Sequence, residues 1–213
     1  MPKLPPPPSA EHLRDVVRLR TRDLVAVTTE TVLWRVHRTR GEHVVPWNAL
    51  RHYGPVASCR FDPQPPPPRP DQADGVTYLA ISAQTALAEA FQTRRLVDRH
   101  LGGPSLVGLR LTRPVRLLDL SRVWPTRAGA SQAISSGRRD LAQAWARRLR
   151  EAFPELEGLW YPSSMDGGGW CVALWTPAAD ALPDAPVLSR PLADPALADR
   201  LAGTAARLGY RLL

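Results

Sequence analysis

The chain has 213 residues, of which 44% are apolar, enough to fill one hydrophobic core, so we expect a single domain. A net charge of +8 would attract a polyanion, but the arginines are spread along the chain and no known nucleic-acid-binding signature accompanies them. The sequence has no apolar run near the ~18 residues of a membrane span and no apolar core of a secretory signal. We therefore expect a cytoplasmic protein without specific nucleic-acid binding.

Two proline-rich segments punctuate the first third of the chain. The first, LPPPP at residues 4–8, predicts an extended arm, and a helix is expected after it at Ala10–Thr21. The second, Gln64–Gly75, cannot donate the hydrogen bonds of a sheet, and we interpret it as a loop inserted within one domain. A partner that recognises proline-rich peptides stays open for this loop.

The next elements are read from hydrophobic periodicity. In TVLWRVHR, residues 31–38, every second residue is apolar, which predicts a strand with one face in the core and Arg35 pointing away from the Trp34 face. Further strands are expected in GVTYLAI, SLVGLRL, VRLLDL, GLWYP and WCVALW, and further helices at Ala83–His100, Arg138–Phe153 and Ala193–Leu208. Strands and helices mix without a regular βαβ alternation. This pattern favours an α+β fold with a mixed or antiparallel central sheet.

Two serines are candidates to begin the helix at Arg138–Phe153. Apolar residues recur every four positions along it, and Ser135 or Ser136 is expected to cap its first turn.

A single carboxylate, Glu89, lies among alanines in the expected helix that follows Ser82. At 100° per residue it shares a small polar face with Thr85, Gln92 and Thr93, opposite the apolar stripe. A solvated glutamate is the common explanation for such a position. However, its i±4 neighbours are threonines rather than the basic partners that an arginine-rich chain could offer. A cleft acid and a solvated acid both remain open at this point.

Several common motifs are absent. The histidines show no HExxH spacing, and Cys59 and Cys171 lie far apart with no CxxC pair, so neither a metal site nor a disulfide is expected. The run DGGGW lacks both GxGxxG and GxxxxGK[ST], and we interpret it as a flexible loop near a site. No GxSxG surrounds Ser163 or Ser164, which argues against a hydrolase with a serine nucleophile.

The motifs taken together resemble the RES-domain family, which is named for an arginine, a glutamate and a serine. The resemblance covers about residues 30–178, and its strongest part is YLAISAQTALAE. The residues that match the family are Arg35, Arg60, Tyr78, Glu89 and Ser163. Two departures affect the loop around Arg60: ASC replaces the usual glycines before it, and the proline-rich insertion at residues 63–75 follows it.

The resemblance implies domain boundaries and a fold. We expect an arm and helix at residues 1–29, the RES domain at 30–178, and an extension at 179–213 whose helix packs on the same domain. The fold is expected to be similar to that of ADP-ribosyltransferase toxins. The chain would need no cofactor, because NAD would be its substrate.

Roles for the five residues also follow from the resemblance. Arg35 and Arg60 would bind the pyrophosphate of NAD, and Tyr78 would stack on the nicotinamide ring. Glu89 would hold the nicotinamide ribose and stabilise the positive charge that develops on it, with Ser163, or Ser164 in its place, hydrogen-bonding nearby. The chemistry is consistent with one acid, because nicotinamide leaves as a neutral molecule and needs no second group to protonate it.

The function implied is that of a toxin of a bacterial toxin–antitoxin pair, which depletes NAD and arrests growth. The acceptor stays open: water gives hydrolysis, phosphate gives phosphorolysis, and a protein side chain gives ADP-ribosylation. The expected partner is an antitoxin with a helix-turn-helix region. The toxin would contact DNA only through this antitoxin, and a homo-oligomer also stays open. The alternative is a non-catalytic basic module that binds nucleic acid or protein.

Overall fold

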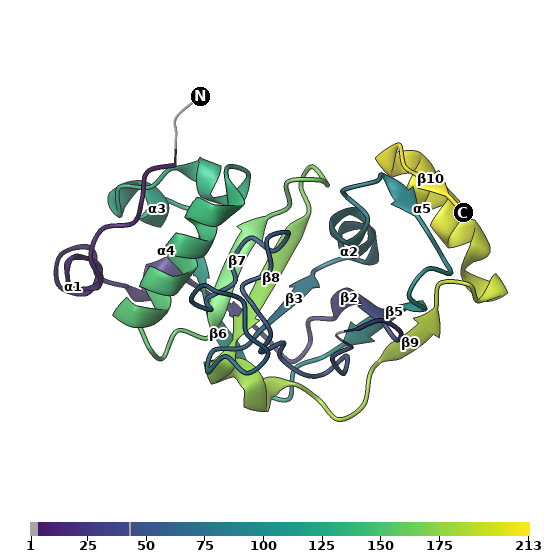
Figure 1. The fold of residues 1–213 in the computed structure, drawn as a ribbon, viewed down its shortest axis with the longest axis horizontal. Coiled ribbons are helices and arrows are strands. Elements are labelled where there is room, and N and C mark those ends of the chain that lie inside the picture. Colours follow the sequence, from purple (N-terminus) through teal and green to yellow (C-terminus); the bar gives the residue numbers. More distant parts are fainter. Residues whose placement is uncertain (1–3, 43) are drawn as a thin grey trace.

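A computed structural model describes residues 4–42 and 44–213 and shows a central sheet with helices packed on it (Figure 1). Its longer strands are Leu24–Val27 (β1), Leu33–Arg38 (β2), Val76–Ala80 (β3), Pro104–Leu109 (β5), Val115–Asp119 (β6), Gly158–Pro162 (β7), Trp170–Trp175 (β8) and Leu188–Pro191 (β9). The strand order is β1-β6-β7-β8-β3-β2-β5-β9, and only the β6–β7 pair is parallel. Leu96–Val97 (β4) and Arg211–Leu212 (β10) form a separate parallel pair. This mixed sheet with flanking helices confirms the predicted α+β class.

The junction between β2 and β3 divides the sheet. A single Cα pair, Trp34 with Ala80, joins these two strands. By contrast, β3 pairs with β8 along its whole length, and β2 pairs with β5 in the same way. The sheet therefore has a five-stranded part that ends at β3 and a three-stranded part that begins at β2.

The helices lie mainly on one side of this sheet, with α4 over the five-stranded part and α2 and α5 toward the three-stranded part (Figure 1). The α-helices are Ala10–His12 (α1), Ala83–Ala90 (α2), Trp124–Arg127 (α3), Arg139–Ala152 (α4) and Ala198–Leu208 (α5). Shorter 3-10 or π turns occupy Leu13–Val17, Thr21–Asp23, Gln132–Ser135, Thr176–Ala181 and Pro195–Leu197.

Three helix boundaries differ from the prediction. The second helix ends at Ala90 instead of His100, because the chain leaves helical geometry at Phe91, where φ is −112° and ψ is 14°; it then turns at Arg95, where φ is +47°, and enters β4. The first helical segment ends at Val17, since Arg18 has a φ of +57°. The last helix begins at Ala198, after a 3-10 turn, instead of at Ala193.

The predicted serine cap of α4 is wrong, although the helix itself is confirmed. Ser135 ends a 3-10 turn and Ser136 follows it, so neither reaches the first turn of α4. The N-cap residue is Arg138, whose side chain makes no capping hydrogen bond.

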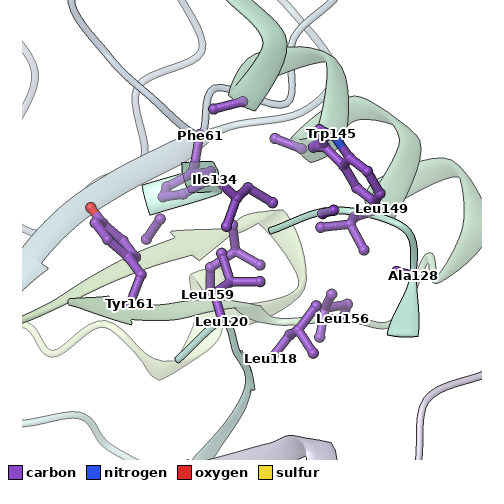
Figure 2. Close-up of a cluster of buried hydrophobic side chains, with 14 of the residues drawn as sticks. Phe61, Leu118, Leu120, Ala128, Ile134, Trp145, Leu149, Leu156, Leu159 and Tyr161 are labelled. Atoms are coloured by element: carbon purple, nitrogen blue, oxygen red, sulfur yellow. The ribbon is translucent and has the colours of Figure 1, made fainter. Parts of the chain in front are cut away.

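The apolar stripe of α4 packs on the five-stranded part of the sheet. Trp145 and Leu149 are fully buried there against Leu159 of β7 (Figure 2). Phe61 enters the same cluster with its ring edge-on to Tyr161, at 4.6 Å between centroids. A loop residue is thus fixed in the core, and burial of such large side chains typically stabilises a fold by ~2 kcal/mol each.

Strand β2 was predicted to bury one face only, and the structure corrects this. Leu33 is fully buried on one side, while Trp34 and Val36 pack on the other side against the cluster that contains α2 and α5. Both faces are covered because helices lie over one and the segment around Trp47 lies over the other.

The second proline-rich segment is a loop, as predicted, and side-chain amides hold it closed. Gln64 donates to the carbonyl oxygens of Arg51 and Asp74, at 3.0 Å each. The Gln72 amide donates to the carbonyl oxygens of Gly54 and of two prolines in the loop. Within the described residues, no helix is long and apolar enough to cross a membrane.

Candidate active site

A cleft of about 460 Å³ opens where β2 separates from β3. The side chains that line it include four of the five residues that match the RES family: Arg35, Arg60, Tyr78 and Glu89. The fifth, Ser163, lies behind Glu89 and contacts it directly. The structure therefore brings together all five residues that the sequence singled out.

Glu89 lies in the last turn of α2, a helix that Ser82 caps by accepting a hydrogen bond from the Thr85 amide. Its Oε1 accepts a hydrogen bond from Ser163 Oγ at 2.6 Å, and its Oε2 accepts one from Gln92 Nε2 at 3.2 Å. Both oxygens act as acceptors, as those of a carboxylate do. The acid is thus held from two sides at the edge of the cleft.

Ser163 is fixed by the loop between β7 and β8. Its Oγ accepts hydrogen bonds from the amides of Met165 and Asp166, at 3.0 Å each. The Asp166 carboxylate in turn accepts from Thr85 Oγ1 at 2.7 Å, which ties the loop to α2. Ser164 is exposed and lines the cleft itself. Ser163 is therefore the serine that positions Glu89, and Ser164 faces the space where a ligand would lie.

The glycines of DGGGW permit this loop to approach α2. A Cβ atom at Gly169 would lie 2.5 Å from Thr85 Oγ1, closer than any side chain tolerates. Gly168 has a φ of +83°, which favours glycine. The loop thus lies beside the site, as the sequence suggested.

Gln92 links Glu89 to an arginine that the sequence analysis missed. Its Oε1 accepts a hydrogen bond from Arg139 Nη2 at 2.8 Å, while its Nε2 donates to Glu89. Arg139 is the first residue of α4 and lines the cleft. Since it follows Gln92 by 47 positions, no local sequence pattern could have paired them.

Arg60 reaches the same place from the loop that Phe61 anchors. Its Nη1 donates to the carbonyl oxygen of Gly137 at 2.5 Å. Gln143 of α4 holds the loop by donating to the carbonyl oxygens of Val56 and Cys59, at 2.8 and 2.7 Å. Burial, and next the charge of Arg139, lower the pKa of Arg60.

Arg35 lies on the opposite side of the cleft, on β2. Its Nη1 donates to the Trp47 carbonyl oxygen at 2.8 Å and to Thr77 Oγ1 at 2.7 Å, and both of these acceptors are neutral. Its buried Nε has no hydrogen-bond partner among the described residues. Burial, together with the nearby charge of Arg51, lowers the pKa of Arg35 to about 10, so the side chain stays cationic at neutral pH.

Tyr78 presents its ring to the cleft and directs its hydroxyl inward. The hydroxyl donates to Asp62 Oδ1 at 2.7 Å and accepts from the Phe61 amide at 2.9 Å. Burial, and next the Asp62 charge, raise the pKa of Tyr78 well above its usual value. The hydroxyl is therefore neutral and engaged in two hydrogen bonds, so the ring is the part of Tyr78 that is available to a ligand.

Asp62, a second residue without a predicted role, is the centre of a hydrogen-bond network behind Tyr78. It is fully buried and accepts from Arg51 Nη2, Tyr78 OH and the Val56 amide, each at 2.7 Å. The Arg51 charge compensates its own. Asp62 follows the family residue Arg60 by two positions, but its partners lie on other segments and gave no local signal.

The charges facing the cleft do not balance. Among the described residues that line it, Glu89 is the single acid, and none of Arg35, Arg60 and Arg139 forms an ion pair with a carboxylate. In the described part of the chain, no group of three or more His, Cys, Asp or Glu side chains is arranged to hold a metal ion. The cleft is suited to an anionic ligand that also presents a centre of positive charge to Glu89.

Comparison with known proteins adds a family match and a similar fold. A family model described as the RES domain matches residues 32–195. Among solved structures, a chain of the MbcT–MbcA toxin–antitoxin complex of M. tuberculosis is similar, with a TM-score of 0.54 and 18% sequence identity. The match covers 84% of this chain and 92% of that chain, and at this identity it shows a shared fold. No curated protein matches the sequence.

Proposed function

Because the chain belongs to the RES-domain family, as the match over residues 32–195 shows, we propose that it cleaves the bond between nicotinamide and ribose in NAD. The observation that carries the proposal is the lone carboxylate, Glu89, in a cleft where Arg35, Arg60 and Arg139 have no acidic partner among the described residues. NAD has the matching pattern of charge, a diphosphate and a cationic pyridinium.

Glu89 stabilises the transition state in this proposal. As the glycosidic bond breaks, the pyridinium takes the bonding electrons and leaves neutral, and positive charge develops on the ribose. A carboxylate already oriented by Ser163 and Gln92 stabilises that charge without reorganising. No general acid is needed, which is consistent with a single acid in the cleft.

The other residues bind and orient the dinucleotide. Arg35 and Arg60 offer guanidinium groups to the diphosphate, for which planar donors are well suited. The Tyr78 ring stacks on the nicotinamide, since its hydroxyl is engaged with Asp62 behind the cleft. Ser164, exposed at the cleft, is available to hydrogen-bond to the ribose or the carboxamide.

In the cell, this activity makes the protein the toxin of a toxin–antitoxin pair. An unregulated NAD-consuming enzyme would starve its host, so a separately encoded antitoxin, with a helix-turn-helix region, is proposed to cover the cleft. A carboxylate of that partner would occupy the arginines that NAD otherwise takes. The similar structure noted above is that of a toxin–antitoxin complex.

The test is to incubate the purified protein with NAD, with and without inorganic phosphate, and to follow small molecules and intact protein by mass spectrometry. Free ADP-ribose indicates hydrolysis, a product heavier by one phosphate indicates phosphorolysis, and a gain of mass on protein indicates ADP-ribosylation. Release of nicotinamide by the wild type and by Glu155→Gln, an exposed control, but not by Glu89→Gln is the expected result. If the wild type releases no nicotinamide, the non-catalytic module is the better account.

A further inference from the structure

The turn that leads into α4 contains a buried hydroxyl with no protein partner. Ser135 is 3% exposed and lines the cleft, yet its Oγ has no hydrogen-bond partner among the described residues. Leaving a buried hydroxyl unpaired costs free energy, and such groups in native proteins call for an explanation. Because Ser135 lines the cleft, its hydroxyl is available to a molecule bound there.

Two guanidinium groups converge on the same turn. Arg60 Nη1 is bonded to the Gly137 carbonyl oxygen, and Arg139 extends from the first residue of α4. The two charges are close enough for Arg139 to lower the pKa of Arg60, after the larger effect of burial. Each guanidinium has five N–H donors, so both keep donors for a ligand. Two like charges, neither of them in an ion pair with a carboxylate of the described residues, attract a multivalent anion.

The tight geometry of the turn depends on Gly137. Its amide donates to the Ala133 carbonyl oxygen at 2.6 Å, and a Cβ atom would lie 2.7 Å from that oxygen. The close approach brings Ser135, Arg139 and the Arg60 contact to one place.

The N-terminus of α4 adds a positive electrostatic potential, which favours an anion. The helix is 14 residues long, and its N-cap residue Arg138 gives it no side-chain cap. Asp140, the acid of the first turn, is exposed and pairs with Arg138, which does not line the cleft. The positive end of the helix dipole therefore acts on the same space as the two guanidinium groups.

We propose that Ser135 and Arg139, with Arg60 opposite them, form a phosphate-binding subsite beside Glu89. Gln92 alone separates Arg139 from the carboxylate, so the bound phosphate lies next to the reacting end of the cleft. Its ligand is a phosphate group, either one of the two in the dinucleotide or free inorganic phosphate. The choice between these two sources of phosphate rests on the proposed function, whereas the existence of the subsite does not.

The experiment measures binding of inorganic phosphate to the full chain by calorimetry or by ³¹P NMR titration, without NAD. Arg139→Met keeps the aliphatic stem and removes the charge, and Ser135→Ala removes only the hydroxyl. Each is expected to weaken phosphate binding about tenfold or more, as loss of a hydrogen bond to a charged group does. Arg138→Met, at the neighbouring exposed arginine, is the matched control and should bind as the wild type does.

Thermal unfolding separates this role from a structural one. Because Ser135 Oγ has no protein partner in the described residues, Ser135→Ala is expected to leave the melting temperature unchanged or to raise it. Phosphate affinity that is equal in the wild type, Ser135→Ala and Arg139→Met, or absent in the wild type, overturns the proposal. Either result leaves NAD cleavage to be judged by its own assay.

Competition identifies the source of the phosphate. If ADP-ribose displaces inorganic phosphate, the subsite takes a phosphate of the dinucleotide. If phosphate still binds to protein saturated with ADP-ribose, and the two variants abolish that binding, the subsite takes free phosphate. Both results support the subsite.

Discussion

The two walls of the cleft hold their charged groups in different ways. The helical wall, formed by Arg60, Glu89, Gln92, Ser135 and Arg139, has an unbroken series of hydrogen bonds from Ser163 through Glu89 and Gln92 to Arg139. On the strand wall, formed by residues 35–38 of β2, Arg35 is held only by neutral oxygens, and β2 meets β3 at a single residue pair. Under the proposed function, this difference means that the most firmly oriented groups lie where positive charge develops as NAD is cleaved. Changes to Glu89 and Gln92 should therefore affect turnover, whereas changes to a phosphate-binding arginine such as Arg35 on the strand wall should affect binding.

Glu89→Gln tests the helical wall most severely. The amide keeps the shape and removes the charge that stabilises the developing cation. We expect kcat for NAD cleavage to fall about 10²–10³-fold, roughly 3–4 kcal/mol, with little change in KM. Nicotinamide release at saturating NAD measures it, with Glu155→Gln as the control. Near-normal turnover would remove Glu89 from the mechanism.

Asp62→Asn tests the support behind the helical wall. Three donors, from Arg51, Tyr78 and the Val56 amide, converge on its two oxygens, and an asparagine offers one oxygen and one donor group in their place. One donor then faces another in a buried site, and Arg51 loses its counter-charge. The free energy of unfolding should fall by about 2–3 kcal/mol, measured by chemical denaturation. An unchanged stability would show that the network contributes nothing to the fold.

Gln92→Met tests the orientation of Glu89 while the charge of Glu89 is kept. The variant keeps the side-chain volume but breaks the link between Glu89 and Arg139, so kcat should fall about tenfold, about the loss expected for one charge-assisted hydrogen bond. The control is Gln132→Met, since the exposed Gln132 amide donates to the Arg122 carbonyl oxygen. Equal rates in the two variants would contradict an orienting role for Gln92.

Arg35→Met tests the strand wall and should have the smallest effect on chemistry. The phosphates keep their charge throughout the reaction, so a cation that binds them contributes equally to the ground state and the transition state. KM should rise about tenfold and kcat should stay within about twofold. Steady-state kinetics over a range of NAD concentrations decide this. A lower kcat with an unaltered KM would assign Arg35 to the chemistry and end the contrast between the walls.

The sequence contained the periodic elements and the family residues, while the contacts between them depend on the fold. Helix α4 is predictable because its apolar stripe is regular, but its serine cap is not, since the chain forms a separate 3-10 turn first. The predicted second helix is too long, because the chain leaves helical geometry at Phe91 and then turns at Arg95 to pair β4 with β10. The short strands β1 and β9 lacked a distinct pattern.

The same limit applies to the site. Glu89 stood out because its helical neighbours were small and polar, which is a local signal. Arg139 contacts Gln92 across 47 positions and Arg60 reaches Gly137 across 77. Asp62 contacts Arg51 and Tyr78, which lie 11 and 16 positions away on separate segments. The packing of the Phe61 loop beside α4 brings Arg60 to Gly137, and no spacing rule within one segment could indicate any of these contacts.

The closed proline-rich loop has a practical consequence for handling the protein. Residues 65–71 are exposed, while Gly54 and Arg69 exchange backbone hydrogen bonds and Gln64 and Gln72 secure the base. The entropy of closing a loop grows only slowly with its length, so extra residues here cost little stability. An affinity tag or a fluorescent label inserted between Pro67 and Arg69 would leave the anchoring glutamines in place. Binding and turnover could then be followed through a reporter that does not enter the cleft.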